Sequence, residues 1–401
     1  MMEAKRWWIL FLATWVQASA TMITYGVGPL STYWQQQMGL SQSEAGFLVS
    51  IVNAGPLLSM IWVGKEMDRR GERWMLGMGL VLLGCLMFGV LYVKQYLLLG
   101  LLLSGIGLLY GVAQPGGTKL IATWFPEGKK GLAMGIRQAA IPIGGGLAGS
   151  LIATLAPSYG ISVAIAFLAG FALMSGMVFL LGYRDQRGTR EQVTSSFLPM
   201  LSRLIRNKNL YPILGIGMML VSVQAILVAH FFGYLTEYLE INERIAGLFF
   251  AITFLTGAIG RIVLPWLYDR LGMRNYYYGL LLTAGCIWVG MIFLSSVSKE
   301  ISVEALFCLS CWLGFFGFGW YSFFILEITK RSEEHAIGLT VGYVLTWNQI
   351  ALIMAPWLFG IFVDGFHDFS KAWNVWSGFI LIVLMGFGIQ AWIHTKKQSR
   401  G

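Results

Sequence analysis

The stretch Gly64-Lys-Glu-Met-Asp68-Arg69-Arg70-Gly71-Glu-Arg73 has a counterpart about half a chain later, in Pro265-Trp-Leu-Tyr-Asp269-Arg270-Leu-Gly272-Met-Arg274. An aspartate, two arginines and a glycine occupy the same places in both copies, and each copy joins two long apolar segments. Further matches keep this order, among them Ala45-Gly46 with Ala246-Gly247. Chance supplies one or two such matches but not an ordered series. The sequence therefore predicts two related halves.

The composition of the chain is typical of an integral membrane protein. Of its 401 residues, 57% are hydrophobic and only 12% are charged, which leaves too few polar side chains to cover a water-soluble surface. The formal net charge of +9 lies between apolar segments and not along one face or tail. This distribution indicates membrane topology and argues against a nucleic-acid partner.

The apolar segments have the length of membrane spans. A helix needs about 20 apolar residues to cross a hydrocarbon core of about 30 Å. Twelve segments qualify, at residues 7–34, 45–64, 74–93, 96–121, 130–155, 161–183, 210–235, 245–267, 276–297, 301–328, 336–362 and 372–393. We predict an all-α membrane protein with twelve transmembrane helices in two six-helix pseudo-repeat bundles, residues 1–183 and 210–401, joined by a cytoplasmic linker at 184–209.

Lysine and arginine residues predict the orientation of the helices. Most of them lie at the termini, in the linker and in the loops of one side, whereas the other side has only Lys94, Arg244, Lys299 and Lys371. The positive-inside rule therefore places both termini in the cytoplasm of a multi-pass protein of the bacterial inner membrane. The N-terminus imitates a signal peptide, but its apolar run continues to Trp34, which favours an uncleaved anchor helix.

The paired motif resembles the G-x-x-x-D-R-x-G-x-R loop of the major facilitator superfamily, and the resemblance covers the whole chain. The second copy departs in having Pro265 for the first glycine. The resemblance implies the major facilitator fold, with a substrate site between the halves near the bilayer midplane, and transport by alternating access. The residues that it implies for a gate are Gly64, Asp68, Arg69, Gly71, Asp269 and Arg270.

Physical chemistry supports a gate at this loop. Gly64 permits close helix approach and Gly71 a tight turn. The Asp68 carboxylate can pair with an arginine, or with a helix N-terminus of the facing half, while the cytoplasmic side is closed. The alternative is that these charges only set the topology.

Arg261 is the sharpest single signal for a substrate site. It lies about two helical turns before Asp269, about 12 Å above the cytoplasmic end of its helix and close to the midplane. A central arginine costs about 2.5–3.5 kcal/mol on the lenient insertion scale, so it is expected to face a cavity and a partner. An anionic substrate would be that partner. The alternative is a structural arginine paired with Glu327 or with helix ends.

Polar and aromatic side chains of other helices complete the expected binding site. The candidates besides Arg261 are Tyr25, Tyr110, Gln114, Arg137, Trp320, Tyr321 and Asn348. Each has packing or an interhelical hydrogen bond as its alternative role, and Arg137 can also reach the cytoplasm. His230 and Glu327 are the candidates for proton coupling, with a hydrogen-bonded interface role as the alternative for His230.

A second resemblance narrows the substrate class. The run Trp124-Phe-Pro-Glu127-x-x-Gly131-Leu-Ala-x-Gly135 is similar to one in bacterial oxalate/formate-type and monocarboxylate transporters. Those families also have an arginine four residues before the first position of the second G-x-x-x-D-R loop. Arg261 stands in the same place before Pro265. Dicarboxylate members add a lysine in helix 11, which this chain lacks. The resemblance implies a secondary active transporter of a small organic anion, a monocarboxylate, coupled to protons.

Other functions have weaker signals. The stretch Pro142-Ile-Gly-Gly145-Gly146 is partly similar to a motif of proton-coupled drug exporters, so a proton-driven exporter of drugs or amphipathic metabolites is the alternative. The stretch Gly111–Thr118 approaches a P-loop but has Gly117 where the lysine should stand. Nothing indicates an enzyme, a cofactor or a metal site. The expected partners are a small anion, protons and membrane lipids, with no nucleic acid, for a monomeric carrier.

Overall fold

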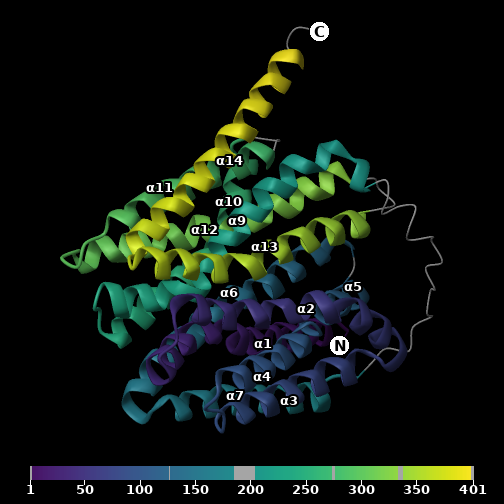
Figure 1. Cartoon of the computed structure of the whole chain (residues 1–401). Coiled ribbons are helices and arrows are strands. Elements are labelled where there is room, and N and C mark those ends of the chain that lie inside the picture. The colour runs from purple at the N-terminus through teal and green to yellow at the C-terminus, as the bar shows by residue number, and fades with distance from the viewer. Residues whose placement is uncertain (1, 126, 185–203, 273–275, 333–336, 399–401) are drawn as a thin grey trace.

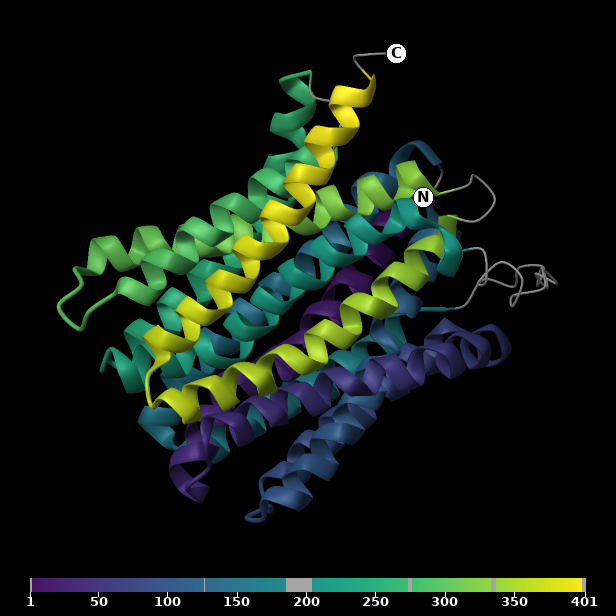
Figure 2. The ribbon, with the colours of Figure 1, turned by 45° about the horizontal axis from the view of Figure 1, so that its top comes forward.

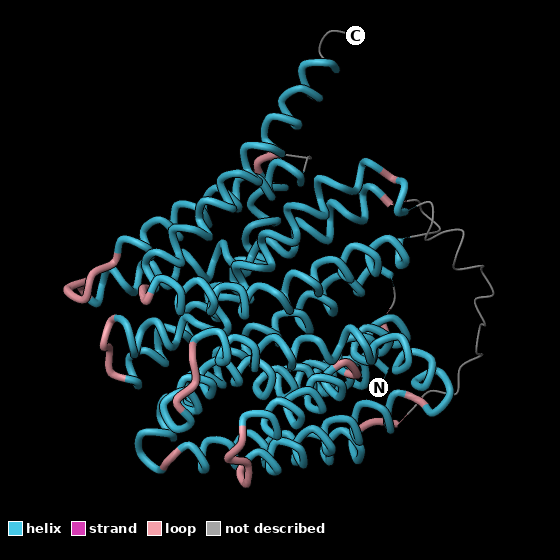
Figure 3. Tube along the Cα trace, in the orientation of Figure 1, coloured by secondary structure: helices cyan, strands magenta, loops and turns pink. Residues whose placement is uncertain are grey.

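The computed structural model describes residues 2–125, 127–184, 204–272, 276–332 and 337–398. Every regular element in these ranges is helical, as Figure 3 shows, so the predicted all-α class is confirmed. The helices of the first half are α1 (Met2–Met38), α2 (Gln42–Arg70), α3 (Glu72–Val90), α4 (Tyr96–Tyr110), α5 (Ala113–Trp124), α6 (Glu127–Tyr159) and α7 (Ile161–Gly182).

The second half repeats this architecture. A short 3₁₀ turn (Lys208–Leu210) leads into α9 (Tyr211–Gly233), which ends in a π-helical turn (Tyr234–Tyr238). The remaining helices are α10 (Glu243–Arg270), α11 (Tyr276–Ser296), α12 (Val303–Arg331), α13 (Ile337–Phe366) and α14 (Phe369–Gln398). In Figure 1 the purple and blue helices of the first half gather in the lower part of the molecule, and the green and yellow helices of the second half gather in the upper part.

The lengths of the helices fit a membrane. In the described chain, 11 helical segments are long and apolar enough to cross a bilayer, and α4 with α5 makes one of them. The helix α2, with 29 residues, completes the predicted twelve. The predicted division at residues 183 and 209 lies beside the end of α7 and the start of α9, but residues 185–203 of the linker lie outside the described ranges.

One predicted helix is not continuous. The segment 96–121 forms one membrane span, as predicted, but its helix is interrupted at Gly111 and Val112, between α4 and α5. Pro115 has no N–H with which to continue the helical ladder at this point. Val112 instead bonds to the Leu109 carbonyl in a tighter, three-residue turn. The predicted span is therefore confirmed, and the turn inside it is a feature that the sequence reasoning did not foresee.

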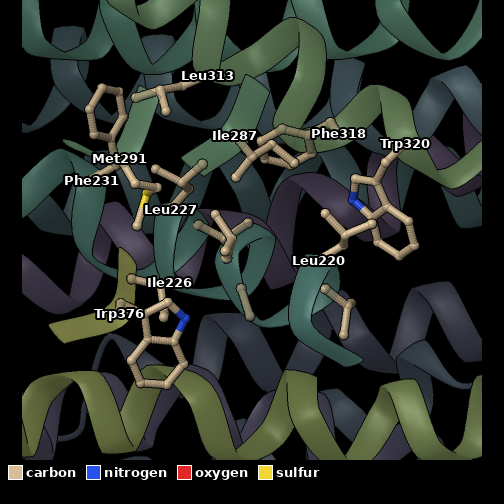
Figure 4. Close-up of a cluster of buried hydrophobic side chains, with 14 of the residues drawn as sticks. Leu220, Ile226, Leu227, Phe231, Ile287, Met291, Leu313, Phe318, Trp320 and Trp376 are labelled. Carbon is tan, nitrogen blue, oxygen red and sulfur yellow. The ribbon is translucent and has the colours of Figure 1, made fainter. Parts of the chain in front are cut away.

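Each half has its own apolar core. The most buried helix, α9, belongs to the core of the second half. Along α9, nearly every residue is buried, as expected for a helix surrounded by others on all sides. Figure 4 shows how α9 side chains meet those of α11, α12 and α14 in the second half; the residues drawn there include Leu220, Ile226, Leu227, Phe231, Ile287, Met291, Leu313, Phe318, Trp320 and Trp376. A separate core fills the first half.

The two bundles meet along three helix pairs, α2 with α13, α6 with α10 and α1 with α9. Figure 2 shows α2 and α13 running side by side through the middle of the molecule. Small residues allow this approach: a β-carbon at Gly46 would lie 2.3 Å from the Pro356 carbonyl oxygen, and one at Gly360 would lie 2.4 Å from that of Gln42. Substrate sites of such paired bundles lie at this interface.

The two ends of the molecule are named here by their connections. The linker end is where α2 meets α3 and where the linker joins α7 to α9. The far end is where α1 meets α2 and α9 meets α10.

Candidate functional site

Arg261 lies where the two bundles meet, about two turns from the linker end of α10. Its side chain is buried, and the residue is 8% exposed. Its Nε donates to the Phe318 carbonyl of α12 at 3.1 Å, and its Nη1 donates to the Gln138 carbonyl of α6, in the other bundle, at 3.3 Å. The guanidinium also lies over the Tyr321 ring, 5.0 Å from its centre. Neutral oxygens and an aromatic face thus hold this charge.

The carboxylate that the sequence suggested for Arg261 has another partner. Glu327 accepts a hydrogen bond from Arg331, one turn further along α12, at 2.7 Å. Its second oxygen, Oε2, is buried without a hydrogen-bond partner. Among the residues that the structure describes, no carboxylate forms an ion pair with Arg261. The positive charge at the interface is therefore not neutralised by the described part of the chain.

Arg137 is held entirely inside the first bundle. It is 0% exposed, and its Nη2 donates to Gln17 Oε1 at 2.8 Å and to the Ala113 carbonyl at 2.9 Å. The same nitrogen lies 3.0 Å from the Gln114 carbonyl. A β-carbon at Gly117 would lie 2.1 Å from Arg137 Nε. The glycine of the P-loop-like stretch thus provides the room in which this guanidinium lies.

Tyrosine side chains line the neighbourhood of the two arginines. Tyr110 of α4 approaches Thr21 Oγ1 at 3.4 Å and receives a hydrogen bond from Gln17 at 3.3 Å. The Tyr25 hydroxyl of α1 receives one from Gln224 of α9 at 3.4 Å. Gln17 bonds to both Tyr110 and Arg137, and the Tyr321 ring lies under the Arg261 guanidinium. The structure thus brings most of the predicted binding residues together.

Several polar atoms around this cluster are buried without partners. They are Gln138 Oε1, Gln224 Oε1, Trp320 Nε1, Arg137 Nε and both amide atoms of Asn348. A buried polar group without a hydrogen bond costs about 1–3 kcal/mol. Trp320 packs edge-to-face against Phe324, and a β-carbon at Gly217 would meet both Phe324 and Asn348, which places Trp320 and Asn348 inside the second bundle. Of the residues with such atoms, Gln224 bonds to Tyr25, and Gln138 receives a bond from Arg261 on its backbone carbonyl.

The far end is closed by hydrogen bonds between the bundles. Asp364, near the end of α13, accepts from the backbone N–H groups of Gln42 and Ser43 at 2.8 Å each. Gln42 also donates to Glu237 at 2.7 Å. Tyr33 donates to Glu243 at 2.6 Å, and Arg244 donates to Ser158 at 2.8 Å. The bonds that join the described parts of the two bundles lie at this end or near mid-helix.

Sequence reasoning missed this closure. Its one local signal is the capping box at the start of α2, where Ser41 and Glu44 bond to each other's backbone N–H groups. That box satisfies the Glu44 N–H and leaves those of Gln42 and Ser43 for an outside acceptor. Asp364 is that acceptor, but no sequence spacing connects it to α2.

The predicted gate at the linker end is described only in part. Gly71 has φ 90° and Gly272 has φ 71°, a backbone conformation that glycine adopts readily. Arg270 lies over the Trp266 ring at 5.3 Å. The surroundings of Gly64 and the side chains of Asp68, Arg69 and Asp269 are not among those that the structure describes. The gate role of these residues stays a prediction.

His230 lies away from the polar cluster, between α9 and α13. Its Nε2 is 2.8 Å from the Pro356 carbonyl, and the residue is 2% exposed. The ring also lies beside Gly46 of α2. This position accounts for a histidine at the helix interface, and its part in proton coupling stays a prediction.

The comparisons with known proteins agree with this architecture. The profile of the Major Facilitator Superfamily matches residues 10–356, so the chain belongs to that family of membrane transporters. An uncharacterized MFS-type transporter of Mycobacterium tuberculosis is 28% identical over 270 residues, which cover 67% of this chain and 60% of the relative. The alignment thus spans less than two thirds of that relative's length.

A second relative and a solved structure extend over more of the chain. A protein of Escherichia coli named probable L-galactonate transporter is 26% identical over 380 residues, 84% of this chain and 79% of the relative. A bacterial homolog of the human lysosomal transporter Spinster, solved in an inward-facing and unoccupied conformation, superimposes with a TM-score of 0.79 at 13% identity, covering 96% of each chain. The predicted major facilitator fold is therefore confirmed.

Proposed function

We propose that the chain is a secondary active transporter of a small organic anion, a monocarboxylate, that works by alternating access and is coupled to protons. The observation that carries this proposal is Arg261, a buried guanidinium at the bundle interface with no carboxylate partner among the described residues. Membrane-embedded charges are costly and mark substrate or ion pathways. A carboxylate supplies the missing charge and matches the guanidinium fork.

The name of the Escherichia coli relative supports the same class, because galactonate is a monocarboxylate. The basic residues at the linker end support an orientation with that end, and both termini, in the cytoplasm of a bacterial inner membrane. In this orientation the closed far end corresponds to a carrier whose outer side is shut.

The exporter alternative rests on Pro142–Gly146, for which packing offers another role. A β-carbon at Gly145 would lie 2.7 Å from the Tyr25 ring, and one at Gly146 would lie 3.2 Å from the Ala251 carbonyl. The glycines thus allow α6 to approach α1 and α10 closely, which any carrier of this fold requires. The motif therefore does not favour export.

Thermal stabilisation of the purified protein by ligands tests the proposal. A ligand that binds only the native protein raises its melting temperature by mass action. We expect small monocarboxylates to stabilise the wild-type protein and the control Arg206→Ala, which removes an exposed arginine, but not Arg261→Ala. Uptake into proteoliposomes should show the same pattern.

Two results would contradict the proposal. Stabilisation by lipophilic cations, with no response to any anion, would favour the exporter. Full anion uptake by a folded Arg261→Ala variant would show that Arg261 does not bind the anion.

A further inference from the structure

We propose that the substrate carries hydroxyl groups as well as its carboxylate, and that Gln224 and Gln138 recognise them. This inference rests on the anion site proposed above and specifies its ligand further. Two glutamines, one in each bundle, contact the two residues at the centre of the cluster. Gln224 bonds to Tyr25, and the backbone of Gln138 bonds to Arg261.

Both amide groups have a hydrogen-bonding atom to spare. The Oε1 atoms of Gln224 and Gln138 are buried and have no partner, and Gln224 is only 5% exposed. The Nε2 of Gln224 is already used by the Tyr25 hydroxyl. If the amide is turned over, its oxygen meets Tyr25 and its nitrogen is left unpaired instead. In either orientation one polar atom of Gln224 needs a partner.

The chemistry of that partner is restricted. A carboxylate oxygen only accepts hydrogen bonds, so it cannot serve an amide oxygen, and a methylene group serves neither amide atom. A hydroxyl both donates and accepts, so it satisfies the amide in either orientation. Tyr25 packs against Phe254, Phe254 packs against Phe318, and the Phe318 carbonyl accepts a hydrogen bond from Arg261. Gln224, which bonds to Tyr25, therefore lies in the same cluster as Arg261, and we expect a ligand whose carboxylate meets Arg261 to extend toward it.

The location of the two amides adds a requirement on the ligand. Gln138 belongs to α6 in the first bundle and Gln224 to α9 in the second. A ligand with hydroxyls on successive carbons can bond to both bundles while its carboxylate stays on Arg261. A plain alkyl carboxylate of equal length has only one polar end and leaves both amides unpaired. The site is thus expected to select polyhydroxylated acids over fatty acids.

Matched six-carbon ligands test the inference with the purified full-length protein. Gluconate has the carboxylate and hydroxyls, hexanoate has only the carboxylate, and sorbitol has only the hydroxyls. We expect gluconate to bind at least about tenfold more tightly than hexanoate, because its hydroxyls form hydrogen bonds with buried groups that hexanoate leaves unpaired. Sorbitol should bind far more weakly than gluconate, because it leaves the Arg261 charge unmet.

Variants then assign the recognition to the two glutamines. Gln224→Leu and Gln138→Leu should each lower gluconate affinity about tenfold and leave hexanoate affinity within about twofold of wild type. Gln95→Leu, at an exposed position of a far-end turn, should change neither. Hexanoate binding also reports that the variants are folded, so a loss of gluconate binding alone is specific.

The outcomes separate this inference from the proposed function. Equal binding of gluconate and hexanoate would overturn the hydroxyl inference, because water would then satisfy the amides, and would leave the anion transporter standing. A preference for gluconate that survives in both glutamine variants would overturn the assignment to these residues. If neither anion binds, and sorbitol or a lipophilic cation does, the anion function itself fails.

Discussion

Asp364 caps the helix of the opposite bundle that begins at Gln42. Its Oδ1 accepts the Gln42 N–H at 2.8 Å, and its Oδ2 accepts the Ser43 N–H at 2.8 Å. A carboxylate at a helix N-terminus is favoured both by these bonds and by the helix dipole. Because the two partners belong to different bundles, the bond exists only while the far end is closed. Asp364 therefore stabilises one state of the carrier against the other.

Removing the Asp364 charge should loosen the far end. Asp364→Ala loses both bonds and is expected to destabilise the closed state by about 1–3 kcal/mol, and Asp364→Asn by less. The readout is the rate of maleimide labelling of Thr32→Cys, a buried interface position on α1, in a background without the four native cysteines. Labelling should accelerate about fivefold or more. The control Asp368→Ala removes a cap within one bundle and should leave the labelling rate unchanged. If Asp364→Ala and Asp368→Ala are labelled at equal rates, Asp364 does not hold the far end closed.

Gly117 should be intolerant of a side chain. Gly117→Ala places a β-carbon against Arg137 Nε, which the surrounding hydrogen bonds hold in place, so we expect a loss of about 1–3 kcal/mol in stability. Thermal melting in detergent measures it. Gly100→Ala is the control, since nothing lies within 4 Å of a β-carbon there. In an Arg137→Met background the effect of Gly117→Ala should shrink; an undiminished loss would mean that the clash lies elsewhere.

Glu327 is predicted from the sequence as a candidate for proton coupling. One of its oxygens bonds to Arg331 and the other is buried and unpaired. We expect Glu327→Gln to abolish the response of uptake to a pH gradient while substrate exchange across the membrane continues. Glu304→Gln, an exposed acid on the same helix, should behave as wild type. If gradient-driven uptake persists in Glu327→Gln, the coupling proton is carried by another group, and His230 is the next candidate to test.

Asp68 is predicted from sequence to act in the linker-end gate. Asp68→Asn should slow turnover more than it weakens substrate binding, because the carboxylate would stabilise a conformation and not contact the substrate. Transport rates in proteoliposomes and binding constants of the purified protein separate the two effects. Unchanged turnover would reduce Asp68 to a topology-setting charge.

The fold was predictable because each apolar run carries its own signal. A membrane span is recognised from the length and hydropathy of its own segment. The repeated loop indicates the duplication without any knowledge of contacts. Arg261 was predictable for a related reason: a charge in an apolar run is conspicuous. The break at Gly111 was missed because proline and glycine are common within membrane helices and do not mark a break by themselves.

The contacts between distant segments could not be predicted in the same way. The partners of Arg137 are mainly backbone carbonyls and amide side chains, which any helix offers. The pairing of Asp364 with Gln42 joins residues 322 positions apart. Such pairings depend on how whole helices are placed, and a single sequence contains no local pattern for them.

The bond from Arg261 to the Gln138 carbonyl has a consequence for selectivity. In the described state, the guanidinium rests on an oxygen that the protein supplies itself. If the proposed function holds, an incoming anion competes with this carbonyl oxygen for the guanidinium. The Gln138 carbonyl is part of the same chain, so it is present at a high effective concentration beside Arg261. Anions that bind weakly or fit poorly would lose that competition, so the proposed site would discriminate among solutes before transport begins.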